Sequence, residues 1–288
     1  MKRQPVLGVI GGSGLYELEG LQSVEHRTVE TPFGAPSSPV IIGDLGGRTV
    51  AFLARHAIGH TIAPAEVNYR ANIYALKALG IERVISVSAC GSLREDYAPG
   101  DVVVPDQLYD RTADRANSFF GDGVVAHVSV AEPFCADLST ALETSVTEAG
   151  GNVHRGGALV TIPGPRFSTR AESNTYRAWG MSIIGMTTCP EAFLAREAEM
   201  CYTVMAHVTD YDVWHIAEEP VTVERVIRTL QANTRLAQQA VAGVLQALPS
   251  GRECACGTAL RDALITSRSH ASPEARRKLA LLLGRYLD

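Results

Sequence analysis

Short apolar runs alternate along this chain with longer segments whose apolar residues recur about every 3.6 positions. The short runs predict strands buried on both faces, and the longer segments predict helices. Strands are expected at 6–10, 48–53, 84–88, 101–104, 158–162, 182–187 and 202–208. Helices are expected at 65–79, 134–149, 170–179, 189–200, 222–248 and 272–287. The alternation predicts an α/β fold with a mostly parallel, twisted central sheet flanked by helices.

The pattern changes only near the end of the chain. Composition shows no break before Pro249, so residues 1–248 are expected to form a single domain that carries the function. Residues 249–288 begin as a loop and end in a basic and then apolar helix, which Ser272 and Pro273 would start as N-cap and first residue. This extension is expected to pack on the same domain.

Composition excludes several classes of protein. Hydrophobic residues make up 46% and charged residues 20% of the 288 residues, the balance of a folded protein with a filled core. The net charge is −5 and basic residues form no stripe, so no nucleic-acid partner is expected. No apolar run approaches a membrane span, so no membrane partner is expected. The first apolar run, 6–10, is too short for a secretion signal, which predicts a cytoplasmic protein.

The six cysteines suggest no disulfide framework. Cys90, Cys135, Cys189 and Cys201 lie in apolar segments and are expected to be small buried core residues, although a contact between Cys135 and Cys201 stays open. The remaining pair, Cys254-Ala-Cys256, is too closely spaced for half of a zinc ribbon, and no matching Cys or His pair follows it. It could form a strained, redox-active bridge or have no role, and we favour no role. No metal is expected.

Small and polar residues follow the predicted strands. A glycine turn, 11–14, follows the first strand, Arg55 and His56 follow the second, and 89–92 follow the third. Glycine turns expose backbone N–H groups, and an Arg guanidinium that donates two parallel bonds beside an imidazole donor can bind an anion. The carboxyl ends of such strands are where ligands bind in open α/β sheets. No acid cluster for Mg²⁺ accompanies these groups, which favours bare inorganic phosphate over a nucleotide polyphosphate.

Two acids follow the strand at 202–208. Asp210 and Asp212 can face one ligand together, because residues two apart in an extended segment point the same way. Two close carboxyls cannot both ionise cheaply, so one can hold a proton, and such a pair suits the N7/N6 edge of adenine. Phe167 offers a face on which a base could stack. The alternative is a solvated acidic loop or a helix N-cap. Phosphate on one side and a purine on the other suggest phosphorolysis of a nucleoside.

A series of short motifs resembles those of one known family, and the resemblance runs from about Val9 to Leu248. In chain order they are Gly11-Gly-Ser-Gly-Leu15, Thr31-Pro-Phe-Gly34, Ala54-Arg-His56, Val67-Asn-Tyr69 with Ala71-Asn72, Ala89-Cys-Gly-Ser-Leu-Arg94, Pro99-Gly-Asp101, Ala131-Glu-Pro-Phe134, Gly164-Pro-Arg-Phe-Ser168 with Arg170-Ala-Glu172, Met186-Thr-Thr188 with Pro190-Glu191, and Thr209-Asp-Tyr-Asp212. Together they resemble the 5′-methylthioadenosine phosphorylases of the trimeric purine nucleoside phosphorylase family. The resemblance implies a purine nucleoside phosphorylase-like fold.

The resemblance also implies roles for particular residues. Phosphate ligands would be Ser13, Arg55, His56, Ser88, Ala89 and Thr187. Met186 would lie under the ribose, and Phe167, Ser168, Asp210 and Asp212 would bind the base. The 5′-substituent pocket would be formed by Val223, Val226 and a neighbouring subunit's His127, with Leu281, Leu282 or Leu283 as candidates to close it. A homotrimer, or a hexamer of two trimers, is therefore expected.

The implied reaction converts 5′-methylthioadenosine and phosphate into adenine and 5-methylthioribose 1-phosphate. Asp210, protonated, would donate to N7 with support from Asp212, and no metal or organic cofactor would be needed. A phosphorylase for another 5′-deoxy- or 5′-halo-adenosine stays open, as does one for a 6-oxopurine nucleoside such as methylthioinosine. The two acids disfavour a 6-oxopurine. The phosphate ligands disfavour a hydrolytic nucleosidase and a nucleoside sensor without catalysis.

Overall fold

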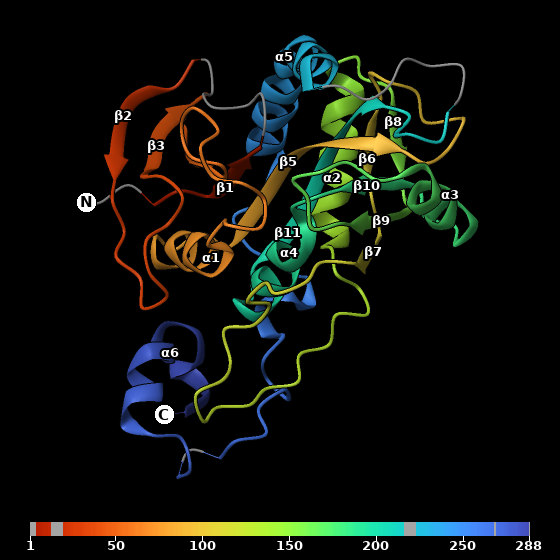
Figure 1. The fold of residues 1–288 in the computed structure, drawn as a ribbon. Coiled ribbons are helices and arrows are strands. Elements are labelled where there is room, and N and C mark those ends of the chain that lie inside the picture. The colour runs from red at the N-terminus through yellow and green to blue at the C-terminus, as the bar shows by residue number, and fades with distance from the viewer. Residues whose placement is uncertain (1–3, 13–19, 216–222, 268, 288) are drawn as a thin grey trace.

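The computed structural model describes residues 4–12, 20–215, 223–267 and 269–287 (Figure 1). Within these ranges eleven strands form one twisted sheet, in the order β2-β3-β4-β1-β5-β10-β9-β7, with β11 between β5 and β6 and with β8 beside β6. Helices cover the sheet on both faces (Figure 1). The predicted α/β class is confirmed.

Four parallel strands form the centre of the sheet: β4 (Arg48–Ala54), β1 (Leu7–Gly11), β5 (Arg83–Ser92) and β11 (Cys201–Asp210). All four were predicted from their apolar runs, although β5 and β11 each extend to ten residues. Every residue of β1 and of β11 is buried. Because the strands are parallel, their carboxyl ends meet at one edge of the sheet.

The outer strands include antiparallel ones. β2 (Gln22–Arg27) and β3 (Val40–Leu45) pair with each other and onto β4, while β6 (Val102–Val104) pairs with β11. β7 (Gln107–Asp110) and β9 (Ala158–Thr161) are parallel neighbours, as are β6 and β8 (Val153–Arg155). β10 (Ile183–Gly185) is parallel to β9 but antiparallel to β5. The sequence did not predict β2, β3, β7 or β8.

The helices fall close to the predicted positions. They are α1 (Tyr69–Ala78), α2 (Ala136–Glu148), α3 (Arg170–Ala178), α4 (Thr188–Glu197), α5 (Val223–Ala247) and α6 (Pro273–Leu287), with a short η1 (Ala255–Thr258). α1 starts later than predicted because Asn68 caps it, accepting from the Ala71 N–H. Thr169 and Glu172 form a capping box on α3.

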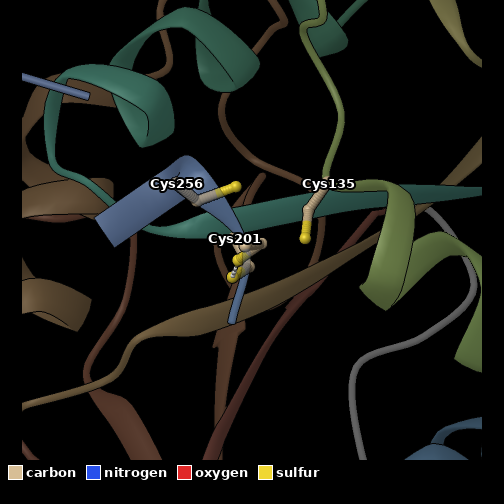
Figure 2. A group of neighbouring side chains, drawn as sticks. Cys135, Cys201 and Cys256 are labelled. Atoms are coloured by element: carbon tan, nitrogen blue, oxygen red, sulfur yellow. Dashed lines mark hydrogen bonds between the residues drawn. The ribbon is translucent and has the colours of Figure 1, made fainter. Parts of the chain in front are cut away.

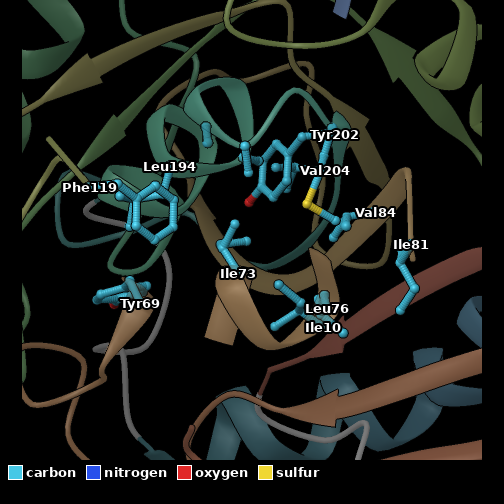
Figure 3. Close-up of a cluster of buried hydrophobic side chains, with 14 of the residues drawn as sticks. Ile10, Tyr69, Ile73, Leu76, Ile81, Val84, Phe119, Leu194, Tyr202 and Val204 are labelled. Atoms are coloured by element: carbon cyan, nitrogen blue, oxygen red, sulfur yellow. The ribbon is translucent and has the colours of Figure 1, made fainter. Parts of the chain in front are cut away.

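Two hydrophobic clusters lie on opposite faces of the central strands. Alternate residues of β11 go to different clusters: Tyr202 and Val204 to one, Cys201 and Met205 to the other. The first cluster contains residues of α1, α4 and α6, and Figure 3 labels those of α1 and α4. The second contains residues of α2 and α5, which pack side by side. The central sheet is thus buried on both faces, as its near-continuous apolar runs predicted.

The end of the chain packs against the loop between β7 and α2. Leu279, Leu282 and Leu283 of α6 join the first cluster, while Leu281 is 38% exposed. The His127 N–H donates to the Ala263 carbonyl at 2.8 Å. In Figure 1, α6 lies beside this loop at the lower end of the molecule. None of the helices described is both long and apolar enough to cross a membrane.

Candidate active site

Arg55 is held rigidly at the carboxyl end of β4. It is 1% exposed, and its Nε and Nη2 donate to the two carboxylate oxygens of Glu191 at 2.7 and 3.0 Å. Nη2 also donates to Ser86 Oγ at 2.6 Å. Burial opposes the charge of the guanidinium, but the adjacent Glu191 carboxylate outweighs burial, so the pKa of Arg55 is raised above its ordinary value. Arg55 is therefore a fixed positive charge.

The remaining nitrogen of Arg55, Nη1, faces the ends of β1 and β5. It lies 3.5 Å from Ser88 Oγ and 3.4 Å from the Val87 carbonyl. A Cβ atom on Gly12 would lie 2.7 Å from the Val87 carbonyl oxygen and 2.8 Å from Nη1. Only glycine allows this approach, which explains the glycine at position 12. One guanidinium nitrogen and one hydroxyl therefore lie close together beside Gly12.

His56 follows Arg55 and is also buried. Its Nδ1 lies 2.9 Å from the Ile62 carbonyl, which can only accept, so Nδ1 carries the hydrogen. Burial, with a smaller effect from the Arg55 charge, lowers the pKa of His56 to about 4. The ring is therefore neutral at pH 7, and its Nε2 is an acceptor. A phosphate that carries a proton could donate to this nitrogen.

Thr187 and Met186 reach the same region through the antiparallel register of β10. Ile183 pairs with Ser92 and Ile184 with Gly91. β10 ends at Gly185, where a Cβ would lie 3.9 Å from the Ala89 carbonyl oxygen, and Met186 and Thr187 follow it directly. The segment that carries these two predicted residues therefore leaves the sheet beside Ala89, although β10 runs against β5 and not along it.

Arg115 fixes the turn after β10. Its Nη1 donates to the carbonyls of Met186 at 2.8 Å and Cys189 at 2.6 Å, and its Nη2 donates to the Pro163 carbonyl at 2.8 Å. Gly164 lies so close that a Cβ there would be 2.6 Å from Met186 Sδ. Arg115 therefore ties the segment that leads to Phe167 against Met186.

Asp210 and Asp212 lie together at the end of β11, 5% and 8% exposed. The register of β11 against β5 shifts between Val208 and Asp210, and such a bulge re-aims the side chains that follow. Gly91 on β5 makes room for them: a Cβ there would lie 3.1 Å from Asp210 Oδ1 and 3.2 Å from Asp212 Cβ. The predicted pair is therefore buried and is not a solvated loop.

The two carboxyls differ in their surroundings. Asp210 accepts from the Thr209 hydroxyl at 2.7 Å and from the Asp212 N–H at 2.8 Å. Burial, with a contribution from the Asp210 charge, raises the pKa of Asp212 to about 6. Asp212 Oδ2 has no hydrogen-bond partner among the residues described. The proton predicted on Asp210 stays a prediction, and the structure adds that burial raises the pKa of its neighbour Asp212.

The predicted base residues follow β9 and precede α3. Phe167 is 36% exposed, so its ring is available for contact with a ligand. Ser168 is buried, and within the described ranges its Oγ has no hydrogen-bond partner. Buried hydroxyls are normally satisfied, so Ser168 is a candidate to bind a polar ligand atom.

The residues predicted to form the pocket for the 5′-substituent are described only in part. His127 and Val223 are both exposed. Val226 belongs to α5, but its side chain lies outside what the structure describes, and so does Ser13. These residue roles remain predictions.

Glu191, Tyr202 and Arg115 were not among the predicted site residues. Tyr202 donates to Glu191 Oε1 at 2.8 Å and so supports the carboxylate that holds Arg55. Tyr202 appeared in the sequence only as a strand residue. Glu191 carried two signals, its place in the motif Pro190-Glu191 and its position as an acid at the start of a predicted helix, but neither assigned it a role. Arg115 stands in a polar stretch without periodicity, so nothing pointed to it.

The four cysteines outside the site form a cluster that the sequence did not predict. The thiols of Cys135, Cys201, Cys254 and Cys256 gather at one place. A contact between Cys135 and Cys201 had been left open, but Cys254 and Cys256 were expected to have no role. The structure places this pair beside the other two thiols, and the expectation that it has no role stays a prediction.

Comparison with known proteins agrees with this geometry. Residues 6–246 match the model of the phosphorylase superfamily. The S-methyl-5′-thioadenosine phosphorylase of Geobacter sulfurreducens is 53% identical over 99% of this chain and 100% of its own length. The S-methyl-5′-thioadenosine phosphorylase of Chloroflexus aurantiacus is 52% identical over 97% of this chain and 98% of its own length.

Solved structures agree as well. A methylthioadenosine phosphorylase from an Antarctic soil metagenomic library superimposes with a TM-score of 0.93 at 45% identity, over 98% of this chain and 100% of that one. The Schistosoma mansoni methylthioadenosine phosphorylase in complex with adenine superimposes with a TM-score of 0.85 at 37% identity, over 89% of this chain and 96% of that one. The chain therefore belongs to the phosphorylase superfamily and, within it, to the S-methyl-5′-thioadenosine phosphorylases.

Proposed function

We propose that this protein cleaves 5′-methylthioadenosine with inorganic phosphate, giving adenine and 5-methylthioribose 1-phosphate for purine and methionine salvage. The observation that carries this assignment is the buried pair Asp210 and Asp212, of which Asp212 has a pKa raised to about 6. A pair that keeps one proton near neutral pH can donate to N7 of adenine and accept from its N6 amino group. The leaving purine departs more easily when N7 is protonated.

Phosphate is proposed to bind between β4, β5 and β10. Arg55 Nη1, the hydroxyls of Ser13, Ser88 and Thr187, the Ala89 backbone and His56 would surround it. Its negative charge stabilises the positive charge that develops on the ribose as the glycosidic bond stretches. Met186 would lie under the ribose and Phe167 against the base, so that both reactants are held in line.

Product analysis with and without phosphate tests this reaction. Adenine release from 5′-methylthioadenosine should require phosphate and yield a sugar 1-phosphate. Equal release in phosphate-free buffer, with free methylthioribose as the product, would identify a hydrolase. A panel of adenosine, 5′-halo-adenosines and methylthioinosine then ranks the 5′-substituent and the base, and methylthioinosine should be the poorest because two acids face the base.

A closed homotrimer is proposed as the working assembly. It is supported by His127, which is exposed on its own subunit while its backbone is fixed on Ala263. Such a residue can reach a neighbour's 5′-substituent pocket beside Val223 and Val226. Light scattering at assay concentration should give a trimer or a hexamer of two trimers, and an active monomer would contradict the proposal.

We also propose how the chain is divided into a catalytic domain and an extension, and where in the cell it is located. Residues 1–248 would be the catalytic domain and 249–288 an extension packed on it, which the contacts of Leu282 and Leu283 with the first cluster support. A cytoplasmic location is proposed, and fractionation of cells that express the tagged chain would test it.

A further inference from the structure

Four cysteines from distant parts of the chain place their sulfur atoms around one point. The Sγ atoms of Cys135, Cys201, Cys254 and Cys256 all lie within 4.8 Å of one another, and those of Cys201 and Cys254 are 3.3 Å apart (Figure 2). All four are free thiols, and three of them are buried. In Figure 2 the side chains of Cys256 and Cys135 extend from either side, with Cys201 lying below them.

The fold sets this arrangement from three directions. Cys201 begins β11, and Cys135 is the N-cap of α2, with its N–H bonded to the Tyr202 carbonyl at 2.8 Å. Cys254 is the N-cap of η1, and Cys256 is the second residue of that turn. The close spacing that argued against a zinc ribbon therefore delivers two thiols to one side of a single site, and the other two come from the sheet and α2.

Two guanidinium groups and a helix N-terminus lie beside the cluster. Arg196 Nη1 lies 3.6 Å from Cys256 Sγ, and Arg252 Nη1 lies 4.0 Å from Cys201 Sγ. Cys135 stands at the N-terminus of α2, where the helix dipole stabilises negative charge. Thiolates bound to a metal carry negative charge, which positive groups in these positions would balance. The positive groups would do little for the uncharged sulfurs of a disulfide.

We propose that these four cysteines bind one Zn²⁺ as a structural tetrathiolate site. Four Zn–S bonds of about 2.3 Å in a tetrahedron put the sulfurs about 3.8 Å apart, so the present spacing needs only a small adjustment. Each thiol that binds gives up its proton to solvent, and no electrons are transferred. All four positions are filled by protein, which leaves no open position for substrate and makes the site structural.

The consequence is an anchor for the end of the chain. Cys254 and Cys256 belong to the extension, while Cys135 and Cys201 belong to the domain before it. A metal bound by both would fix 254–256 on the sheet and, with it, the segment that leads to α6. Loss of the metal should therefore loosen the extension before it affects the sheet.

Metal analysis of the untagged protein, purified under reductant without chelator, tests the site. Elemental mass spectrometry should find about one zinc per chain. Cys254→Ser with Cys256→Ser should lose it, while Cys90→Ala, which removes a buried cysteine outside the cluster, should keep it. Limited proteolysis of the double variant should cut first within 249–288.

A second measurement covers the case in which the double variant fails to fold. Wild-type protein stripped of metal and titrated with Co²⁺ should develop the intense visible bands of a tetrahedral cobalt thiolate, and Zn²⁺ should abolish them. Protein that is zinc-free as purified and gives no such bands when reduced would overturn the proposal. A native mass that is lower than the reduced mass by the hydrogens of one or two disulfides would also overturn the proposal. Iron bound in place of zinc would overturn it as well.

Discussion

Asparagine at position 212 should stabilise the protein at neutral pH while it impairs recognition of adenine. Asp212 is 8% exposed, and its pKa is raised from 3.8 to about 6, with burial as the main cause. A shift of about two units corresponds to roughly 3 kcal/mol of differential interaction between the two protonation states. The carboxyl is thus kept at a cost in stability, as is common for groups that serve function.

The direction of the pH dependence follows from this shift. Between about pH 4 and pH 6 the folded state keeps a proton that the unfolded state releases, so stability falls as the pH rises through that window. The full destabilisation from the buried, ionised Asp212 carboxylate is present above about pH 6. The amide of the asparagine variant does not titrate in this range, so Asp212→Asn should match the wild type near pH 4 and gain up to about 3 kcal/mol at pH 8.

Urea unfolding at pH 4, 6 and 8, at one protein concentration, measures this difference. His56 and His207, whose pKa values are both lowered to about 4, impose an opposite trend, but they are common to both proteins and cancel in the comparison. Asp262→Asn, at an exposed position, is the matched control and should show no gain at any of the three values. A position-212 variant whose stability parallels the wild type at every pH would refute the reasoning. Unchanged kcat/KM on 5′-methylthioadenosine would also remove Asp212 from the base site.

Three further substitutions probe the rest of the site. Asp210→Asn should lose about 10²–10⁴-fold in kcat on 5′-methylthioadenosine and gain relative activity on methylthioinosine, since an amide can donate to N7 but is no acid; kcat/KM for the two nucleosides measures this. Arg55→Ala should mainly raise the KM for phosphate, and an unchanged phosphate KM would contradict its assignment. Glu191→Gln leaves a buried guanidinium without its counter-charge and should lower the free energy of unfolding by about 3 kcal/mol in urea. Its control, Asp96→Asn in the exposed pair with Arg94, should cost less than about 1 kcal/mol.

The central elements of the fold could be predicted because their signal is local. A strand buried on both faces is mostly apolar, and so are the runs that become β1, β4, β5 and β11. β2 and β7 are mostly exposed edge strands with polar sequences, so they carry no such signal. The direction of β10 against β5 depends on pairing between segments about ninety residues apart, which no local pattern encodes.

In the site, residues expected to touch a ligand could be predicted from the sequence, whereas residues that hold them in place could not. Residues expected to touch a ligand follow strands directly, and the meeting of parallel strand ends brings them together. The residues that hold them come from elsewhere: Glu191 is 136 positions from Arg55, and Arg115 is 71 from Met186. Cys135 and Cys256 likewise meet only because α2 and the extension reach the same end of β11. A single sequence shows the ligand residues but not these supports.

The support of Arg55 changes the role that the sequence suggested for it. An Arg-His pair at a strand end suggested a guanidinium that grips an anion with two parallel bonds. In the structure that two-pronged face is used by Glu191, at 2.7 and 3.0 Å, and Nη2 also serves Ser86. Phosphate can therefore meet only Nη1, as one donor among the hydroxyls around Ser88. Because the buried carboxylate already neutralises much of the charge, phosphate binding should depend more on pre-set geometry than on long-range attraction. The phosphate KM should accordingly change little between low and moderate ionic strength, whereas an exposed cationic clamp would weaken markedly as salt is added.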